Sequence, residues 1–306
     1  MDDEALFDVG LFLAYGVLGA SSFVGAKAGL PYFPPLLFGA LRLDLGAALL
    51  IGYVYVTRSY WTPKTRTDVV CTLITGVFTV GVAIPLLYLG QQYVTSGVGS
   101  VVYSFTPILT GVAAIGLLPT VNLDVTDAIG FVLGLIGVAV VAGVDPERLL
   151  TSDVRGVALV FGSAFAFALG NVVVQRLRPS LPSATLTSWG LVLAALTSHA
   201  MSLATGESPA AIQWTTQAWV ALVVTGIFAG ALYYGIHFEL VRRIGSTRTN
   251  LVYYVMPISA TLAGWLLLDE QITLSTVAGF GLIFVGFVSV EYHSLLAAVR
   301  WGSSPD

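Results

Sequence analysis

Apolar stretches of about twenty residues, the length of helix that crosses a bilayer core roughly 30 Å thick, follow one another along nearly the whole chain. Short segments with proline, glycine or charged side chains separate them. Of the 306 residues, 56% are hydrophobic and only 10% are charged, whereas about 25% are charged in an ordinary soluble domain. Water therefore cannot be the main solvent of this surface, and we expect an all-α polytopic membrane protein.

Turn residues and charges divide the chain into ten predicted transmembrane helices. They cover residues 6–30, 33–57, 67–90, 95–117, 125–143, 154–175, 184–204, 215–240, 246–268 and 273–295. An even number of spans places both termini on one side of the membrane. Cytoplasmic loops are enriched in lysine and arginine. Nine such residues fall on the side of the termini and two on the opposite side. We therefore predict a multi-pass protein of the cell membrane with both termini in the cytoplasm.

The second half of the chain repeats features of the first half. Tyr-x-x-x-Pro begins at Tyr103 and again at Tyr253, and Gly-Phe-x-Leu-x-x-x-Gly begins at Gly130 and again at Gly279. Five spans per repeat is an odd number, so the second copy would enter the membrane from the opposite face.

The repeat therefore predicts two inverted five-helix units, residues 1–150 and 151–306. Inverted repeats are typical of secondary transporters, in which two similar halves exchange inward-open and outward-open shapes around a central site. The alternative is a duplication that only builds a stable helical bundle.

Short motifs in both halves resemble those of the EamA-like ten-span members of the drug/metabolite transporter superfamily. The resemblance covers roughly residues 11–290 and rests on Ser21-Ser22-Phe23, Thr106-Pro107, Arg243-Ile244-Gly245-Ser246 and Leu268-Asp269-Glu270-Gln271-Ile272-Thr273. It implies a transporter of small metabolites, often an exporter, without a bound cofactor. The first-half counterpart of the acidic turn, Leu118-Pro119-Thr120, lacks a glutamate.

Two tyrosines are the first candidates for the substrate cavity. A proline inside a helix leaves the carbonyl four residues earlier without its amide partner, and for Pro107 and Pro257 these carbonyls belong to Tyr103 and Tyr253. In hydrocarbon such a carbonyl must face protein or a watered cavity. We predict that both tyrosines line the cavity, and two kinked, well-packed helices are the alternative.

Other uncharged or weakly basic side chains at membrane depth are further candidates for substrate binding. Tyr234 and His237 share a helical face and, with Tyr88, could form a polar wall. His237 is also a candidate proton carrier, because histidine titrates near neutral pH. Ser22 and Asn171 offer polar atoms from the first and sixth spans. For each of them, an interhelical hydrogen bond is the alternative role.

Ionisable residues inside a membrane are costly and are therefore candidates for function. Arg42 and Asp44 fall near the middle of the second span, and Lys27 lies near the outer end of the first. Asp44 is a candidate for proton or cation coupling. Arg42 and Lys27 are candidates for attracting a substrate carboxylate or for bracing an outer gate.

Several functions are excluded or disfavoured by missing motifs. One cysteine, Cys71, allows neither an intrachain disulfide nor a multi-cysteine metal site. Phosphate-binding and dinucleotide-binding glycine motifs are absent, so the chain is not predicted to hydrolyse ATP. His199, His237 and His293 are scattered and no paired-carboxylate motif occurs, which disfavours an intramembrane enzyme. We also expect no metal and no nucleic acid, and the family resemblance implies no cofactor.

The leading hypothesis is a secondary active transporter, an exporter or exchanger working by alternating access as a monomer or homodimer. Its predicted substrates are amino acids or related amphipathic compounds, with possible proton or cation coupling. A facilitative carrier or channel for another small solute is the alternative, followed by an intramembrane enzyme.

Overall fold

The computed structural model describes residues 3–118, 125–142 and 152–301, and within these ranges every regular element is a helix. The first half contains α1 (Asp3–Gly29), α2 (Pro35–Thr57), α3 (Arg66–Leu73), η1 (Ile74–Val80), α4 (Gly81–Gln91), α5 (Ser96–Tyr103), α6 (Thr106–Leu117) and α7 (Val125–Val141). The second half contains α8 (Ser152–Leu177), α9 (Ser183–Ala204), η3 (Pro209–Ala211), α10 (Thr216–Val223), η4 (Val224–Leu232), α11 (Tyr233–Ile244), α12 (Ser246–Asn250), α13 (Val252–Leu268) and α14 (Leu274–Trp301).

Eight helical stretches in the described ranges are long and apolar enough to cross a membrane. They are Leu6–Gly29, Pro35–Thr57, Arg66–Gln91, Ser96–Leu117, Val154–Leu177, Ser183–Ala204, Thr216–Ile244 and Arg248–Leu268. Two shorter apolar helices, Ala128–Val141 and Leu274–Ser289, coincide with the fifth and tenth predicted spans. The prediction of an all-helical polytopic membrane protein is thus confirmed.

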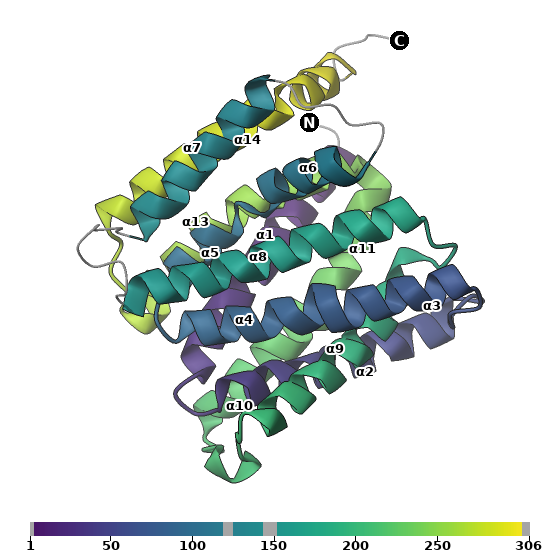
Figure 1. Cartoon of the computed structure of the whole chain (residues 1–306), viewed down its shortest axis with the longest axis vertical. Helices are drawn as coiled ribbons and strands as arrows, with labels where there is room; N and C mark the ends of the chain where they lie inside the picture. The colour runs from purple at the N-terminus through teal and green to yellow at the C-terminus, as the bar shows by residue number, and fades with distance from the viewer. Residues whose placement is uncertain (1–2, 119–124, 143–151, 302–306) are drawn as a thin grey trace.

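The helices form a bundle in which segments from both halves alternate (Figure 1). The pair α2 and α9 lies at one end of the long axis, and the pair α7 and α14 lies at the other. Between them, α1 packs against α13, and α4 packs against α8. The first and second halves of the chain therefore contact each other throughout the bundle.

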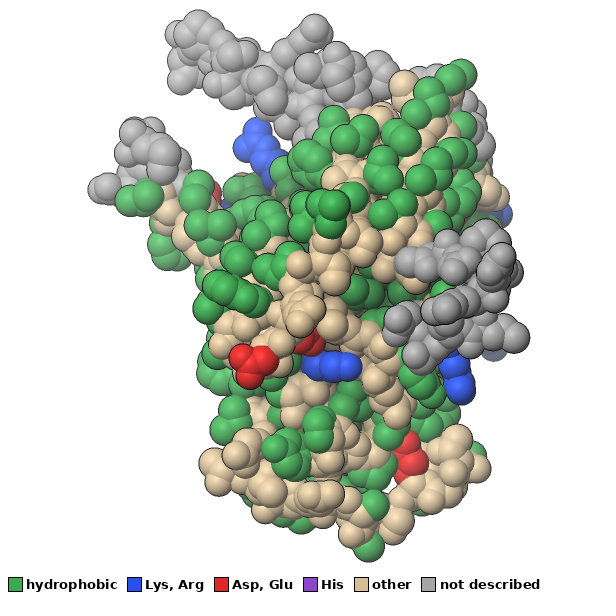
Figure 2. All heavy atoms as spheres, turned by 90° about the vertical axis from the view of Figure 1, so that its left-hand side faces the viewer, with side chains coloured by type: hydrophobic (Ala, Val, Ile, Leu, Met, Phe, Trp, Pro, Cys, Tyr) green, Lys and Arg blue, Asp and Glu red, His purple; other side chains and the backbone are tan. Residues whose placement is uncertain are grey.

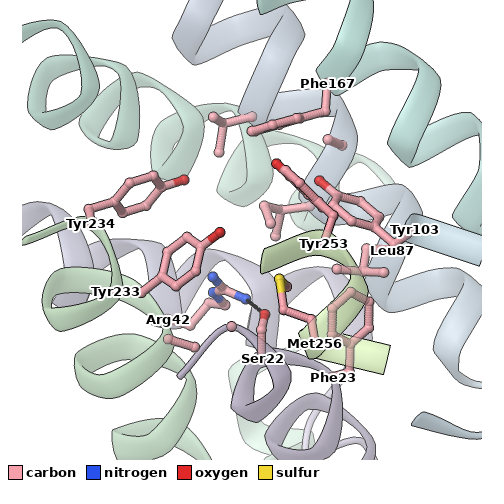
Figure 3. A pocket seen from close by; sticks show the side chains of 15 residues that line it. Ser22, Phe23, Arg42, Leu87, Tyr103, Phe167, Tyr233, Tyr234, Tyr253 and Met256 are labelled. Carbon is pink, nitrogen blue, oxygen red and sulfur yellow. Dashed lines mark hydrogen bonds between the residues drawn. The ribbon is translucent and has the colours of Figure 1, made fainter. Parts of the chain in front are cut away.

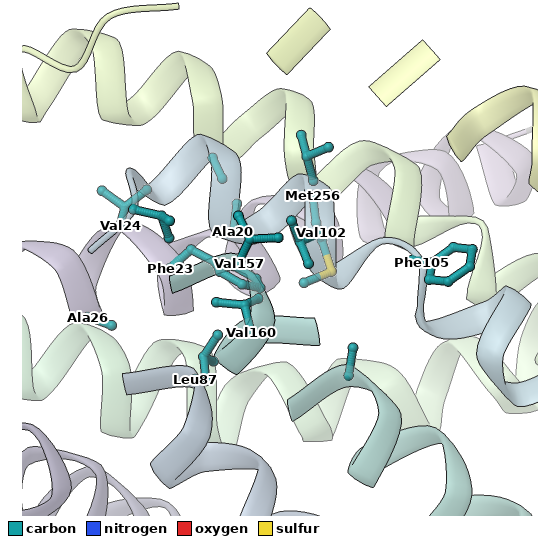
Figure 4. Close-up of a cluster of buried hydrophobic side chains, with 14 of the residues drawn as sticks. Ala20, Phe23, Val24, Ala26, Leu87, Val102, Phe105, Val157, Val160 and Met256 are labelled. Carbon is teal, nitrogen blue, oxygen red and sulfur yellow. The ribbon is translucent and has the colours of Figure 1, made fainter. Parts of the chain in front are cut away.

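A large cluster of buried apolar side chains joins the middle helices. Figure 4 shows part of it, where Phe23 of α1, Val102 of α5 and Val160 of α8 meet Met256 of α13. At the edge of the bundle, backbones approach closely: a Cβ on Gly137 of α7 would lie 2.7 Å from a carbonyl oxygen of α14. Small residues allow such contacts, which drive helix association in lipid.

Two spans contain π-helical turns, η1 between α3 and α4 and η4 between α10 and α11. Both carry Thr-Gly-x-Phe, beginning at Thr75 and Thr225, and these threonines lie 150 residues apart, as do Tyr103 and Tyr253. A π turn holds about one more residue than an α turn, so it rotates the side chains that follow it about the helix axis. Such turns often occur at functional sites.

The fourth span is broken at its centre instead of being kinked. α5 ends at Tyr103 and α6 begins at Thr106, so Pro107 lies in the first turn of α6, where its missing N–H is not needed. The carbonyl of Tyr103 accepts a hydrogen bond from Thr106 Oγ1 at 2.5 Å. Pro257, in contrast, lies inside α13.

Three carboxylates cap helix N-termini that are distant in the sequence. Asp68 accepts hydrogen bonds from the backbone N–H groups just before α9, Glu207 accepts them at the start of α2, and Glu270 accepts them at the start of α5. Negative charge is favourable there because the helix dipole is positive at its N-terminus. Figure 2 shows the bundle from the left of Figure 1, where charged side chains are few and hydrophobic ones predominate.

Candidate functional site

A cavity of about 70 Å³ lies in the bundle between helices of the two halves. The first half contributes residues of α1, α2, α4 and α5, together with the last residue of η1, and the second half contributes residues of α8, η4, α11 and α13. Its polar side chains are Ser22, Arg42, Tyr103, Tyr233, Tyr234 and Tyr253. Its apolar wall includes Phe23, Val80, Ala83, Ile84, Leu87, Phe167, Ala229 and Met256.

The cavity contains one charged side chain, Arg42, which is only 6% exposed. Its Nη1 donates hydrogen bonds to Ser22 Oγ at 2.8 Å and to Tyr88 Oη at 3.4 Å. Its Nε has no hydrogen-bond partner among the residues that the structure describes. Within the same residues, no carboxylate lies within 4.0 Å of the guanidinium. A buried cation of this kind is costly unless another group pairs with it.

Four tyrosines surround the space into which Arg42 points (Figure 3). Tyr103 is the last residue of α5, Tyr253 lies in the first turn of α13, and Tyr233 and Tyr234 directly follow the π turn η4. Their hydroxyl groups are directed toward the same central space (Figure 3). The helix break and the π turn therefore bring four ring faces and four hydroxyl groups to one site.

A second shell of hydrogen bonds holds one of these tyrosines. Tyr15 of α1 is 2% exposed, and its hydroxyl donates to Tyr233 Oη at 2.9 Å. The two rings stack with their centroids 4.5 Å apart. Tyr15 Oη also lies 2.8 Å from His237 Nδ1, in a hydrogen bond whose direction depends on the histidine tautomer. His237 is therefore linked to the cavity through Tyr15 and Tyr233, and it does not line the cavity itself.

The other predicted polar residues lie at different distances from the cavity. Tyr88 is fully buried behind Arg42, with its ring centroid 5.8 Å from the guanidinium carbon. Lys27 donates from Nζ to the carbonyl of Gln91 at 2.9 Å, at the end of α4. Asn171 is exposed on α8, one turn beyond Phe167, and does not belong to the lining.

Asp44 also lies outside the cavity lining. Its carboxylate forms a hydrogen bond with His199 of α9, with 2.8 Å to Nε2, and the side chains of Asp44 and His199 are 48% and 34% exposed. A single residue, Leu43, separates the two charged side chains of α2, yet Arg42 faces the cavity and Asp44 faces the outer surface of the α2–α9 pair.

Sequence reasoning missed Tyr15, Tyr233, Phe167 and Met256. A signal for the first was present, because Tyr15, Gly19 and Ser22 recur at the spacing of one helical face. No comparable signal distinguishes Tyr233 from its neighbours as a lining residue, because the π turn before it interrupts the helical periodicity.

The chemistry of the lining suits binding. Its described residues include one cation, four phenols and no aspartate, glutamate, histidine or cysteine. Among the described residues, no group of three or more metal-ligating side chains occurs. The lining therefore offers one positive charge, several hydroxyl groups and aromatic ring faces.

The family comparison agrees with this picture. The sequence profile of the EamA-like transporter family matches residues 7–143 and again residues 154–291. The uncharacterized transporter YoaV of Bacillus subtilis is 27% identical over 87% of this chain and 90% of its own length. The uncharacterized transporter YvbV of the same organism is 29% identical over 88% and 86%.

One protein of known crystal structure has the same fold, with a TM-score of 0.64 over 93% of this chain and 97% of its own, at 20% identity. The two profile matches together cover most of the sequence. The chain is therefore a multi-pass membrane transporter that belongs to the EamA-like transporter family.

Proposed function

We propose that this protein is a secondary active transporter, an exporter or exchanger, that carries amino acids or related amphipathic compounds by alternating access. The observation that carries the proposal is the cavity itself, because helices from both halves supply a buried arginine and four tyrosines to one space. Its substrate is a small molecule, and the lipid bilayer surrounds the outer surface of the helical bundle.

The proposed architecture has ten spans in two inverted repeats, residues 1–150 and 151–306. The two successive matches to one family profile support it. The Thr-Gly-x-Phe π turns, which lie 150 residues apart, support it as well. In this arrangement the repeats rock around the cavity and expose it alternately to the two sides of the membrane. We place both termini in the cytoplasm and the protein in the cell membrane, as a monomer or homodimer.

The size of the cavity favours a moving structure. A space of about 70 Å³ holds a few water molecules, whereas sites for small molecules usually measure about 300–1,000 Å³. A whole metabolite enters only if the walls separate. Such a change is expected of a carrier, whose site opens to one side at a time.

The energy source belongs to the same proposal. Asp44, which hydrogen-bonds to His199, is the candidate for proton or cation coupling, since an ionisable residue at membrane depth is costly and is therefore a candidate for function. Arg42 and Lys27 are the candidates for gating, one at the cavity and one at the end of α1.

The test is counterflow in proteoliposomes. Vesicles are preloaded with one unlabelled amino acid, labelled amino acid is added outside, and uptake is followed with and without a pH gradient. A carrier gives transient accumulation that protein-free vesicles lack, and a pH response indicates proton coupling. Of the alternatives, a channel equilibrates the label without accumulation, and a facilitative carrier shows counterflow but no net uptake against a gradient. Absence of counterflow for every amphipathic solute tested, with folded protein, contradicts the proposal.

A further inference from the structure

Arg42 carries a charge that has no counter-ion among the residues that the structure describes. Its side chain is more than nine-tenths buried, and its two hydrogen-bond partners, Ser22 and Tyr88, are neutral hydroxyl groups. Its buried Nε has no partner among the described residues. An arginine that only braced helices would be expected to meet a carboxylate or several carbonyl groups.

Four carboxylates of the described residues in the spans or at their ends are engaged elsewhere. Asp68, Glu207 and Glu270 cap helix N-termini, and Asp44 pairs with His199. Arg243 offers a contrast within the same chain: it lies at the end of α11 and contacts the carboxylates of both Glu239 and Asp8. Within the part of the chain that the structure describes, no carboxylate is left to pair with Arg42, so a bound anion can take that place.

The rest of the lining defines the body of that partner. Phe23, Phe167 and the rings of four tyrosines form an aromatic enclosure, and the tyrosine hydroxyls point inward (Figure 3). Once the walls separate, this enclosure favours an apolar or aromatic group, because aromatic rings gain from contacts with other rings beyond the area they bury. It offers a positively charged group no carboxylate to pair with.

Building on the proposed transport function, we infer that Arg42 binds the carboxylate of the substrate and that the cavity prefers an organic monoanion with an aromatic body. A monoanion neutralises the single charge of the lining. A zwitterion of the same skeleton brings an ammonium group that loses water and finds only phenol oxygens and ring faces. An amine without a carboxylate places a second cation beside Arg42.

Three probes share one skeleton and differ only in charge: 3-phenylpropanoate is an anion, phenylalanine is a zwitterion and phenethylamine is a cation. Binding of each to the purified protein in nanodiscs is measured by calorimetry, and counterflow is measured separately in proteoliposomes. We expect 3-phenylpropanoate to bind at least about tenfold more tightly than phenylalanine, a difference that corresponds to one lost charge-assisted contact, and phenethylamine not to bind.

Variants at one position test the residue. Arg42→Gln is expected to weaken binding of 3-phenylpropanoate by about 30-fold or more, as on removal of one partner of a buried charge pair. Arg42→Lys keeps the charge and is expected to retain part of the affinity. Arg243→Gln, the matched control outside the cavity, is expected to bind like the unaltered protein.

The outcomes separate this inference from the transport function. Equal binding of the three probes, or unchanged binding of 3-phenylpropanoate by Arg42→Gln, overturns the inference. Binding that depends on Arg42 without any counterflow supports the inference and contradicts the transport proposal. Counterflow of phenylalanine without binding of 3-phenylpropanoate supports the transport proposal and contradicts the inference about Arg42. If Arg42→Gln does not fold, the three probes on the unaltered protein and Arg42→Lys still decide the question.

Discussion

Replacing Asp68 by alanine should loosen the start of α9. The Asp68 carboxylate accepts hydrogen bonds from the backbone N–H groups of Thr65, Ser180 and Leu181 at 3.1, 2.9 and 3.0 Å. The hydroxyl groups of Tyr60 and Ser180 also donate to it. Asp68 is fully buried, so one side chain joins the beginning of α3 to the beginning of α9.

The expected loss follows from the freed N–H groups. A buried donor without a partner costs about 1–3 kcal/mol. Because Asp68 lies at the ends of helices, water can reach the freed groups after truncation, and we take the lower value for each of the three, about 3 kcal/mol in total. For a chain of this size, about 2 °C of midpoint corresponds to 1 kcal/mol, which gives a fall of about 6 °C.

The single cysteine provides a local assay. Cys71 is fully buried and packs in a small cluster with Leu181 and Leu186, close to the cap. A thiol-reactive fluorophore therefore reports opening at this place, while circular dichroism in the same heating scan reports loss of the whole fold. At 25 °C, Asp68→Ala should label faster than the unaltered protein, and its apparent midpoint at a fixed scan rate should be lower.

Two variants sharpen the comparison. Asp68→Asn keeps an acceptor for part of the cap and should lose about 1 kcal/mol, or about 2 °C. Glu207→Ala removes the cap at the start of α2, at the opposite end of α9, so it should lower the midpoint without faster labelling of Cys71 at 25 °C. Labelling and midpoint that are unchanged in Asp68→Ala would refute the capping argument.

Three further predictions concern the cavity, the cap of α5 and the edge of the bundle. Tyr103→Ala and Tyr253→Ala should each reduce counterflow several-fold while the protein still inserts, as measured by uptake and by the yield of folded protein; full uptake in both variants contradicts their place in the substrate site. Glu270→Ala removes the acceptor for Ser96 N and Oγ and should lower the melting midpoint by about 2–4 °C, the effect of a lost N-cap. Gly137→Leu should separate α7 from α14, since even a Cβ lies 2.7 Å from the facing carbonyl; an equal midpoint in a heating scan would argue against close packing there.

The positions of the spans could be predicted from the sequence because the bilayer sets a length and a polarity for every helix that crosses it. The helix α2, for example, begins at Pro35 and ends at Thr57, close to the predicted range 33–57. The break at Ser104 and Phe105 was harder to foresee. The Tyr-x-x-x-Pro motif predicts a disturbed helix, but whether it kinks or starts anew depends on the neighbouring helices.

The cavity could be predicted only in part. Tyr103, Tyr253, Tyr234, Ser22 and Arg42 belong to its lining, and each was a candidate because a polar group at membrane depth needs a partner or water. The sequence could not separate them from Asn171, which is equally polar and lies on an exposed face of α8. Polarity gives the depth of a residue in the membrane, and it does not give the rotation of its helix.

By itself, the sequence determined that the chain lies in a membrane, roughly where its spans lie, and which few polar groups lie at membrane depth. These properties follow from the transfer of each side chain and backbone group into lipid, which depends on local composition. Only the tertiary structure decided that Arg42 faces the cavity while Asp44, two residues later, pairs with His199 outside it. Helix rotation results from packing between segments far apart in the chain, and the π turns before α4 and α11 shift that rotation by an amount that no local pattern records.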